Sequence, residues 1–516
     1  MTFDERLDKI DALPAALLDR QQIKDFYEIE EFARLVERDR FAVREWATNS
    51  RIRSCRGVAT TPVGSSATTS GSGISGRACC LKRDGVTPRG VGRIDDYLFR
   101  TSHSRRKDQA MLVGYQREAA ESGRFQNGSQ EGFLTHLGEA PVAIIAPTGS
   151  GKGRDFIIPN ILNHKGPVIV PDPKGELYAV TARHRRKMGQ VAAIRPFGEK
   201  IDTLNPFDYF SLPGSRLETD AEMFASYLGV GHEFGTDPFW SDSATGLIAG
   251  LIACMVSCGN PSVRTLTQIL YADDLAMHLA RQLDAKREGS RLAHDEFVAF
   301  LNHPAEETRP SVLSTARTYI KCLATEEVAC SMEDSTISLR KVLAGEPITL
   351  YIIIPPEKLH SHRTLLRLWV GVLLNTILKR QFQPEHRTLF ILEEAAQLGT
   401  FPPLLTATTL MRAYGLQLIT VWQNMAQLKS RYPADWTTIL DNCEVIVAFG
   451  LGHYGSACEL GAYCGIEPAQ LLDLRPDEAA VSIRHRRPQF IRRMNYLRDG
   501  MFRGMFDPNP IYQRSR

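Results

Sequence analysis

A glycine-rich turn, APTGSGKG at residues 146–153, directly follows the apolar run Val142–Ile145. This order predicts a buried strand that leads into a phosphate-binding loop. The glycines allow backbone N–H groups to converge on a polyphosphate at a helix N-terminus, and Lys152 is expected to reach its β and γ phosphates. The residues expected to bind nucleotide are Pro147, Thr148, Gly149, Ser150, Gly151, Lys152 and Gly153.

The turn departs from the GxxxxGK[ST] pattern at both ends. Ala146 replaces the first glycine, and Gly153 stands where a Ser or Thr usually ligates magnesium. A Gly-Ser-Gly-Lys turn can also be an ordinary surface loop. The turn by itself therefore suggests a nucleotide site without deciding it.

A second motif, TLFILEE at residues 388–394, has four apolar residues followed by two carboxylates. It predicts a buried parallel strand with Glu393 and Glu394 at its carboxyl end. Ligands of open α/β sheets lie outside the carboxyl ends of the strands, so both motifs should face one crevice. Glu393 is then expected to hold Mg²⁺ through water, and Glu394 to polarise the attacking water. Taken alone, such an acid pair is more often the solvated start of a helix.

The chain resembles the type IV secretion coupling-protein family, the TraG/TraD kind of conjugative DNA-transfer ATPase, from about residue 138 to 512. The resemblance is carried by APTGSGKG with IIPNIL at 157–162, PDPKGE at 171–176, LNPF at 204–207, PFWSDSA at 238–244 and the run 392–450. The family's own loop often reads Gly-Lys-Gly. The family usually has Asp-Glu in place of Glu393-Glu394, and the longer first side chain shifts the reach of the metal-binding carboxylate.

The resemblance implies roles for two more residues. Arg412 occupies the place of an arginine finger that reaches the γ-phosphate of a neighbouring subunit, and Gln423 looks like the glutamine that senses this phosphate. Each also has a plain interpretation. An exposed arginine usually solvates a helix face, and a glutamine after a strand often caps the next helix.

Asp172 and Lys174 follow the apolar run Val168–Val170 and are expected at the same sheet edge. Their position allows contact with nucleotide-bound water. The segment Asp172-Pro173-Lys174-Gly175 is equally typical of a simple turn with an Asx start.

The charge is nearly balanced, with 62 Lys and Arg against 59 Asp and Glu in 516 residues, a net charge of +3. Contact with nucleic acid must therefore come from local patches. Basic residues cluster at 105–107, 184–187, 485–487 and 492–493, and each cluster is expected to be a solvated face. The ten cysteines show no CxxC pair or His partner at metal spacing, which indicates reduced thiols in a cytoplasmic protein.

The coupling family typically begins with transmembrane helices. The longest uncharged stretch here, Ser243–Val263, contains several Gly, Ser and Thr residues and a Pro, and it predicts a buried helix rather than a span. We therefore expect a cytoplasmic protein without a transmembrane segment, which a partner can recruit to the cytoplasmic face of the inner membrane.

The fold class expected is α/β, a RecA-like P-loop NTPase core with an inserted all-α domain. The runs 480–483 and 489–491 predict closing strands of the core sheet. The expected organisation is a helical N-terminal arm (1–50), a flexible basic linker rich in Ser, Thr and Gly (51–135), the first part of the nucleotide-binding domain (136–215), the all-α domain (216–334) and the second part of the nucleotide-binding domain (335–516).

The resemblance implies an ATPase that uses ATP and Mg²⁺ as a homohexameric ring, with Lys152, Glu394, Arg412 and Gln423 as its catalytic residues. It would recruit single-stranded DNA bound to a relaxase and deliver it to a type IV secretion channel, with the channel ATPases and inner-membrane components as partners. Two alternatives stay open: a HerA/FtsK-type translocase of duplex DNA, in chromosome handling or phage defence, and a receptor or adaptor whose nucleotide only sets its assembly. The run 392–450 favours the coupling family over the duplex translocase.

Overall fold

The computed structural model describes residues 110–116, 133–199, 202–229, 238–287 and 289–512. These residues all lie in one compact unit, Gly92–Arg516. The predicted N-terminal arm and most of the predicted linker lie outside the described residues.

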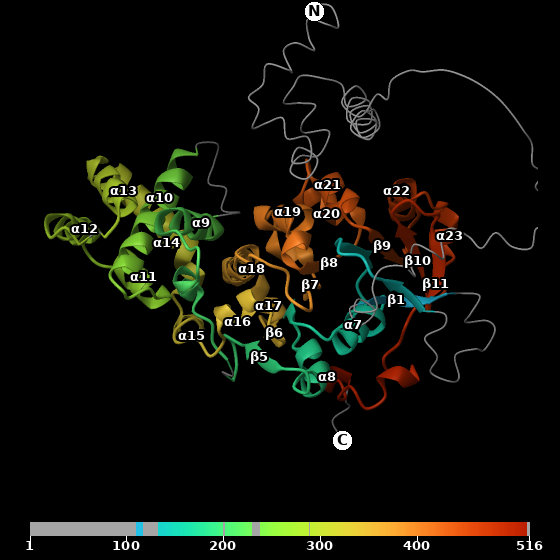
Figure 1. Ribbon diagram of the computed structural model, residues 1–516. Coiled ribbons are helices and arrows are strands. Elements are labelled where there is room, and N and C mark those ends of the chain that lie inside the picture. Colours follow the sequence, from blue (N-terminus) through green and yellow to red (C-terminus); the bar gives the residue numbers. More distant parts are fainter. Residues whose placement is uncertain (1–109, 117–132, 200–201, 230–237, 288, 513–516) are drawn as a thin grey trace, which may run out of the picture. The chain divides into compact units, whose positions relative to one another are not determined.

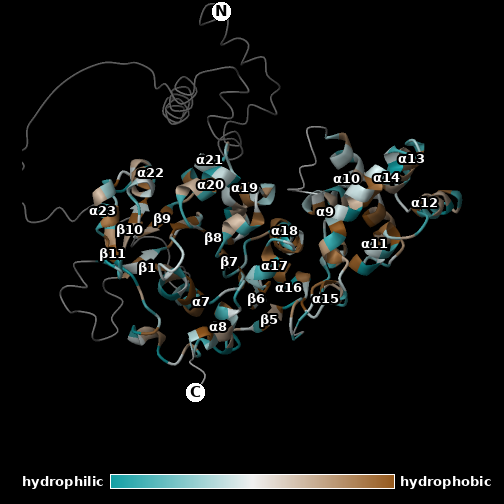
Figure 2. Ribbon diagram, turned by 180° about the vertical axis from the view of Figure 1, so that it is seen from behind, coloured by the Kyte–Doolittle hydropathy of each residue, from teal (hydrophilic) through white to brown (hydrophobic). Residues whose placement is uncertain are grey.

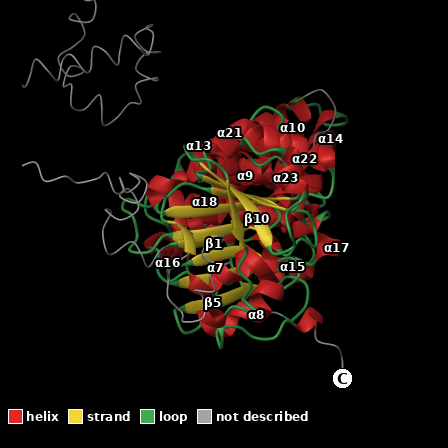
Figure 3. Cartoon of the chain, turned by 90° about the vertical axis from the view of Figure 1, so that its right-hand side faces the viewer, coloured by secondary structure: helices red, strands yellow, loops and turns green. Residues whose placement is uncertain are grey.

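The described strands form one sheet of 11 strands in the order β2-β1-β11-β10-β9-β3-β8-β7-β4-β6-β5 (Figures 1 and 3). Their bounds are β1 Met111–Gln116, β2 Phe133–His136, β3 Val142–Ile145, β4 Val168–Pro171, β5 Gln190–Ile194, β6 Ile348–Ile352, β7 Thr388–Leu392, β8 Leu416–Trp422, β9 Val445–Phe449, β10 Glu478–Ile483 and β11 Gln489–Arg492.

From β9 to β5 in this order, every neighbouring pair is parallel. Strands β3, β4, β6 and β7 are buried along their whole length, as expected for parallel strands that are covered on both faces. Successive residues of β3 enter two different hydrophobic clusters, because side chains alternate between the two faces of a sheet. The prediction of an α/β fold is confirmed.

The other end of the sheet is antiparallel. Strand β10 pairs with β9 and β11, and β11 pairs with β1, so the predicted closing strands are confirmed. The predicted linker 51–135 is wrong over Met111–Gln116 and over residues 133–135, because these residues form β1 and most of β2. Residues 111–115 are buried. Strand β1 pairs with β11 in the sheet, a contact that the local Ser/Thr/Gly composition cannot indicate.

Helices cover both faces of the sheet (Figure 3), and they carry both hydrophobic and hydrophilic residues (Figure 2). Those of the sheet region are η4 Gly153–Ile157, α7 Ile158–Asn163, α8 Glu176–Arg185, α17 Pro356–Leu359, α18 Arg363–Leu378, η7 Ala395–Leu398, α19 Pro402–Thr409, η8 Met411–Tyr414, α20 Met425–Arg431, α21 Trp436–Asp441, α22 Tyr454–Cys464, α23 Pro468–Leu472, η9 Gly500–Phe502 and η10 Pro510–Tyr512.

Between β5 and β6 the described chain is helical. These elements are η5 Pro206–Ser211, α9 Leu217–Gly229, α10 Phe239–Ser257, α11 Val263–Leu270, α12 Leu275–Asp284, α13 Arg291–Asn302, α14 Thr308–Ile320, η6 Lys321–Leu323, α15 Glu326–Ser331 and α16 Leu339–Ala344. Helices α9 to α14 form one group, drawn in green in Figure 1. The predicted domain limits at residues 216 and 334 stay predictions.

Helix α10 covers most of the predicted buried stretch, and it packs against α9, α13 and α14. It is the one described helix that is long and apolar enough to cross a membrane by length and composition alone. Half of its most apolar window is buried within the protein. Residues such as Leu247, Ile248 and Leu251 belong to the main hydrophobic core, which accounts for the apolar composition of this helix.

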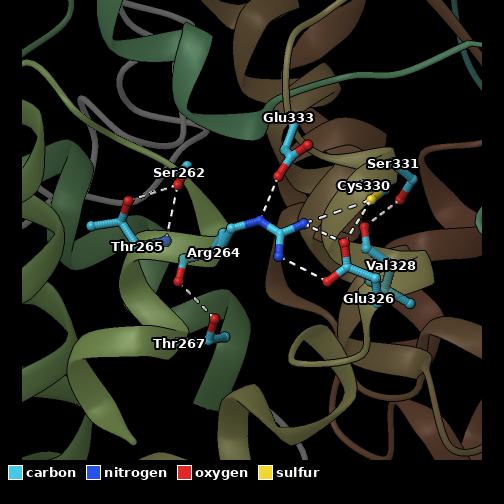
Figure 4. A network of polar contacts seen from close by, with 9 residues as sticks. All are labelled: Ser262, Arg264, Thr265, Thr267, Glu326, Val328, Cys330, Ser331 and Glu333. Carbon is cyan, nitrogen blue, oxygen red and sulfur yellow. Dashed lines mark hydrogen bonds and ion pairs between the residues drawn. The ribbon is translucent and has the colours of Figure 1, made fainter. Parts of the chain in front are cut away.

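An ion-pair network joins α11 to the segment around α15 (Figure 4). The Arg264 guanidinium donates to both carboxylate oxygens of Glu326, at 2.7 and 2.8 Å, and to Glu333 at 2.6 Å. These hydrogen bonds hold the pKa of Glu326 down at about 2. The network fixes the ends of two short helices at the surface.

Candidate functional site

The predicted phosphate loop leaves β3 and turns sharply into a helix. Its first amide, on Ala146, donates to the carbonyl of Trp422 at the end of β8, at 2.8 Å. Gly149 and Gly151 have φ of 79° and 90°, a left-handed region that favours glycine. The helix begins at Gly153, so the loop lies at a helix N-terminus, the position where a phosphate-binding loop is found.

The carboxyl ends of four adjacent parallel strands, β3, β8, β7 and β4, meet at this loop. They are followed by Lys152, Gln423, the pair Glu393–Glu394, and Asp172. The sheet order therefore brings together the residues predicted at the carboxyl edge, of which Lys152 and Gln423 are 271 positions apart in the sequence.

The carboxylate of Glu394 contacts three side chains at this edge of the sheet. Its Oε2 atom lies 3.4 Å from Lys152 Nζ. Its Oε1 atom accepts hydrogen bonds from Gln423 Nε2 at 3.0 Å and from Gln427 Nε2 at 3.1 Å. Three donors from three different segments thus orient one carboxylate next to the loop.

Glu393 is in a different environment from its neighbour. Burial, and then the charge of Asp172, raise the pKa of Glu393 to about 7. A Cβ atom built on Gly153 would have Glu393 Oε1 as its nearest neighbour, at 4.0 Å. The position that carries the Ser or Thr in the strict motif therefore faces Glu393 across open space, and a carboxylate oxygen there is a ligand type that suits Mg²⁺.

Asp172 combines the two interpretations made from the sequence. It closes a turn, because its carbonyl accepts from Gly175 N at 3.1 Å and its Oδ2 accepts from Tyr178 N at 2.8 Å. The Oδ1 atom of Asp172 is buried without a hydrogen-bond partner in the described chain. Burial raises the pKa of the Asp172 carboxyl to about 6. Lys174 is exposed. The free Oδ1 fits a site that takes up a hydrated cation near Glu393.

Gln423 and Arg412 lie at opposite ends of β8. Gln423 follows its carboxyl end and contacts Glu394, whereas Arg412 lies in η8, before its amino end. Arg412 is exposed and forms no hydrogen bond or ion pair through its guanidinium with other described residues. The structure therefore brings Lys152, Glu393, Glu394, Gln423 and Asp172 together and leaves Arg412 apart.

Gln427 was not predicted from the sequence. It lies one turn into α20, and its side chain binds both Glu394 and the amide of Gln423, the latter at 2.9 Å. Asn424 caps the same helix by accepting from Gln427 N at 2.8 Å. The spacing of Asn424 and Gln427 was the available signal, since a helix N-cap residue is often followed three residues later by a Glu or Gln whose side chain reaches back to the start of the helix.

Two arginines from the predicted solvated clusters are in fact buried, so that expectation is wrong for both. Arg493 is 9% exposed, donates to the carbonyl of Ser150 at 2.5 Å and pairs with Asp155 at 3.3 Å. Arg493 therefore links the phosphate loop to the first turn of the helix that follows it. Arg185 is 1% exposed and donates to backbone carbonyls such as that of Gly166, at 2.6 Å. In both cases tertiary contacts supply acceptors that neighbouring residues in the sequence do not reveal.

The parallel sheet, the loop after β3 and the carboxylates after β7 define a RecA-like P-loop NTPase fold. The family described as "Type IV secretory system Conjugative DNA transfer" matches residues 100–466. The chain belongs to this family, which confirms the resemblance drawn from its motifs.

Individual relatives agree with this assignment. The chain is 28% identical over 345 residues to a conjugal transfer protein TraG of Escherichia coli, covering 61% of this chain and 53% of the relative. It is 24% identical over 422 residues to protein VirD4 of Agrobacterium fabrum (strain C58 / ATCC 33970), covering 73% and 61% respectively. The chain thus spans about half the length of the TraG relatives that it matches.

Solved structures support the fold. The bacterial conjugative coupling protein TrwBdeltaN70 superimposes with a TM-score of 0.58 at 17% identity, over 74% of this chain and 93% of that chain. TrwB in complex with ADP and Mg²⁺ gives the same TM-score at 16% identity, over 74% and 94% respectively. At this identity the comparison establishes the RecA-like architecture.

Proposed function

We propose that this chain is an ATP-driven coupling protein that recruits relaxase-bound single-stranded DNA and delivers it to a type IV secretion channel. The observation that carries the proposal is the contact of Glu394 with Lys152, Gln423 and Gln427 beside the phosphate loop. It is the arrangement expected of a catalytic carboxylate in a P-loop ATPase. Family membership supports coupling over a duplex translocase or an adaptor.

In the proposed reaction, the amides of residues 147–153 and Lys152 bind the β and γ phosphates of ATP. Glu394 accepts the proton of the attacking water, and Gln423 and Gln427 keep its carboxylate in place. Mg²⁺, when bound, would neutralise charge on the phosphate oxygens. Glu393, with Asp172 nearby, would hold the ion through water. TrwB, a structural neighbour, has been solved with an ATP analogue and with ADP and Mg²⁺.

Arg412 is proposed to act on the nucleotide of a neighbouring subunit. Its exposed position at the amino end of β8 supports this, because that end lies at the edge of the sheet opposite the phosphate loop of its own chain. A ring of subunits, as in a homohexamer, would place this edge against the next site. Ring assembly would then be part of catalysis.

The partners and location follow from the same proposal. They are a relaxase, single-stranded DNA, and the ATPases and inner-membrane components of the channel, at the cytoplasmic face of the inner membrane. Relatives named conjugal transfer protein TraG support a role in conjugal transfer.

The decisive experiment measures ATP turnover of the purified chain alone, with single-stranded DNA and with duplex DNA. We expect single-stranded DNA to stimulate turnover the most, and added salt to weaken the stimulation because phosphate contacts release counterions. Binding of a relaxase from the same transfer system is measured in parallel. A preference for duplex DNA would favour the translocase alternative, and turnover that ignores DNA would favour the adaptor.

A further inference from the structure

Three arginines gather around Gly399, in the loop that follows η7. Arg363 and Arg367 lie one turn apart at the start of α18, and Arg431 ends α20. A Cβ atom built on Gly399 would lie 2.5 Å from Arg367 Nη2 and 3.5 Å from Arg363 Nη1. The Arg431 carbonyl accepts from Thr400 Oγ1 at 2.9 Å, which brings the end of α20 to the same loop. We refer to Arg363, Arg367 and Arg431 as the arginine cluster.

The charges of the arginine cluster oppose one another. Burial and the charge of Arg431 lower the pKa of Arg363. Burial, and then the charge of Arg363, lower the pKa of Arg367 to about 10. Among the described residues, Arg363 and Arg431 form no ion pair, and Arg363 Nε is buried without a hydrogen-bond partner. Positive charge is therefore concentrated here without a matching carboxylate on Arg363 or Arg431.

The helix that carries two of these arginines adds to the positive potential. Helix α18 has 16 residues, its first turn contains no acidic residue, and its N-cap residue His362 makes no side-chain cap. The N-terminus of a helix carries partial positive charge, so Arg363 stands at the end where a cation is least favourable. This arrangement is stabilised when an anion binds between the guanidinium groups.

We propose that the arginine cluster binds a phosphate group of a nucleic-acid strand. Guanidinium groups match the geometry of phosphate oxygens and form paired, charge-assisted hydrogen bonds with them. Arg363 and Arg431 are half-buried, whereas Arg367 is 2% exposed, so the first two are the residues of the cluster that retain solvent exposure. The choice of a nucleic acid as the source of the phosphate rests on the proposed function.

The position of the arginine cluster links it to the catalytic carboxylate. The short helix η7, Ala395–Leu398, begins directly after Glu394 and ends at Leu398, whose carbonyl accepts from Arg367 Nε at 2.6 Å. One turn of chain therefore has the catalytic carboxylate at one end and the arginine cluster at the other. A phosphate that draws Arg367 toward it acts on the end of this turn, which provides a route from bound DNA to hydrolysis.

The test uses the double variant Arg363→Gln with Arg431→Gln, which leaves the bonded Arg367 in place. The affinity for a fluorescently labelled oligothymidylate is measured over a range of salt concentrations. Each phosphate contact on a single strand contributes about 0.7 to the slope of log affinity against log salt, so the loss of this one phosphate contact should lower the slope by about 0.7 in magnitude. The matched control is Arg281→Gln with Arg287→Gln, which removes the same charge from two exposed arginines of the helical region and should keep the wild-type slope.

Folding is monitored by thermal melting at low salt. Because the double variant relieves repulsion, it should melt at the wild-type temperature or above. A lower melting temperature together with an unchanged salt slope would show that the arginines only support the structure, and would overturn the inference. The variant Arg363→Lys with Arg431→Lys should keep most of the slope, since it retains both charges.

Measurements of thermal stabilisation by inorganic phosphate distinguish a site for a nucleic-acid phosphate from a site for a free phosphate ion. If the double variant loses stabilisation by phosphate yet binds the oligonucleotide as wild type does, the site takes a small anion and the inference is overturned. A different result would refute the proposed function without affecting the inference about the arginine cluster. Wild-type protein that binds DNA through the arginine cluster but does not hydrolyse ATP would refute the ATPase and leave this inference standing.

Discussion

The two ends of strand β8 differ sharply in their surroundings. At the carboxyl end, Gln423 and Gln427 bind Glu394, which also contacts Lys152. At the amino end, Arg412 is exposed, and its guanidinium group has no hydrogen-bond or ion-pair partner in the described part of the chain. The strand has seven residues, so its ends are on the order of 20 Å apart.

The difference shows that one subunit assembles its functional residues at one edge of the sheet. A distance on the order of 20 Å exceeds the reach of an arginine side chain, so Arg412 cannot contact a phosphate held by the loop of its own chain. If Arg412 takes part in hydrolysis, it does so at another subunit. The following predictions test this contrast, from the largest expected effect to the smallest.

Lys152→Ala should abolish measurable ATP hydrolysis, because it removes the charge that neutralises the β and γ phosphates in both ground and transition states. Turnover is measured by phosphate release. Lys187→Ala, at an exposed lysine outside the site, serves as the control and should retain wild-type turnover. Normal turnover of the Lys152→Ala protein would show that the residues gathered at the carboxyl end of β8 do not form the active site.

Arg412→Ala should lower turnover about 10³-fold, the effect typical of losing an arginine finger. Mixing it with Lys152→Ala protein should restore part of the activity, because some interfaces then pair an intact Lys152 with an intact Arg412. The specific activity of the mixture is compared with that of each variant alone. Failure to recover activity in confirmed mixed assemblies would place Arg412 in folding or in another contact.

Glu394→Gln should slow hydrolysis about 10²-fold and change nucleotide affinity little, because the amide keeps the shape of the side chain but cannot accept a proton. Single-turnover kinetics and binding of a fluorescent ATP analogue separate the two effects. Glu393→Gln should instead raise the Mg²⁺ concentration needed for half-maximal rate. A swap of these two phenotypes would reverse the roles of the carboxylates.

Gln427→Ala should lower the turnover number about threefold to tenfold, since Glu394 loses one of its three donors and the remaining two still orient it. The exposed residue Gln470 provides the control variant, Gln470→Ala, with no expected effect. A loss as large as that of Glu394→Gln would give Gln427 a direct part in the reaction.

The stability of the metal-free protein should depend on the protonation of Glu393. The pKa of this carboxyl is raised from 4.5 to about 7 in the folded state, so the folded protein binds more protons than the unfolded chain between these pH values. Its stability should therefore fall as the pH rises from about 4.5 to about 7. Glu393→Gln should flatten this decline in thermal melts, with a remainder due to Asp172, whose pKa is raised to about 6. An unchanged pH profile would contradict the buried environment described for Glu393.

Much of the core and of the site could be predicted because the signals are local. Strands β3, β4, β6, β7 and β8 are apolar runs bounded by turn or polar residues, and such runs indicate buried parallel strands wherever they occur. The polar residues directly after these runs are placed at the carboxyl edge by the strand direction alone. Lys152, Glu393 and Glu394 were found in this way, whereas Gln423 was identified through the family resemblance.

Residues that act through distant partners could not be predicted. The basic pairs around Arg185 and Arg493 look like solvated charge in the sequence, yet both side chains are buried against acceptors from other elements. Strand β1 shows the same limit. Its apolar residues lie next to a Ser/Thr/Gly-rich region, and their role depends on pairing with β11, far along the chain.

The sequence by itself determined the phosphate loop, the acidic strand and the α/β class, since each rests on residues adjacent in the chain. The tertiary structure decided which carboxylate pairs with Lys152 and which arginine binds the phosphate loop. It also decided where the three arginines around Gly399 meet. Lys152 and Glu394 are 242 positions apart, and Arg493 and Ser150 are 343 apart. Contacts over such separations depend on the order of strands in the sheet, which no local pattern encodes.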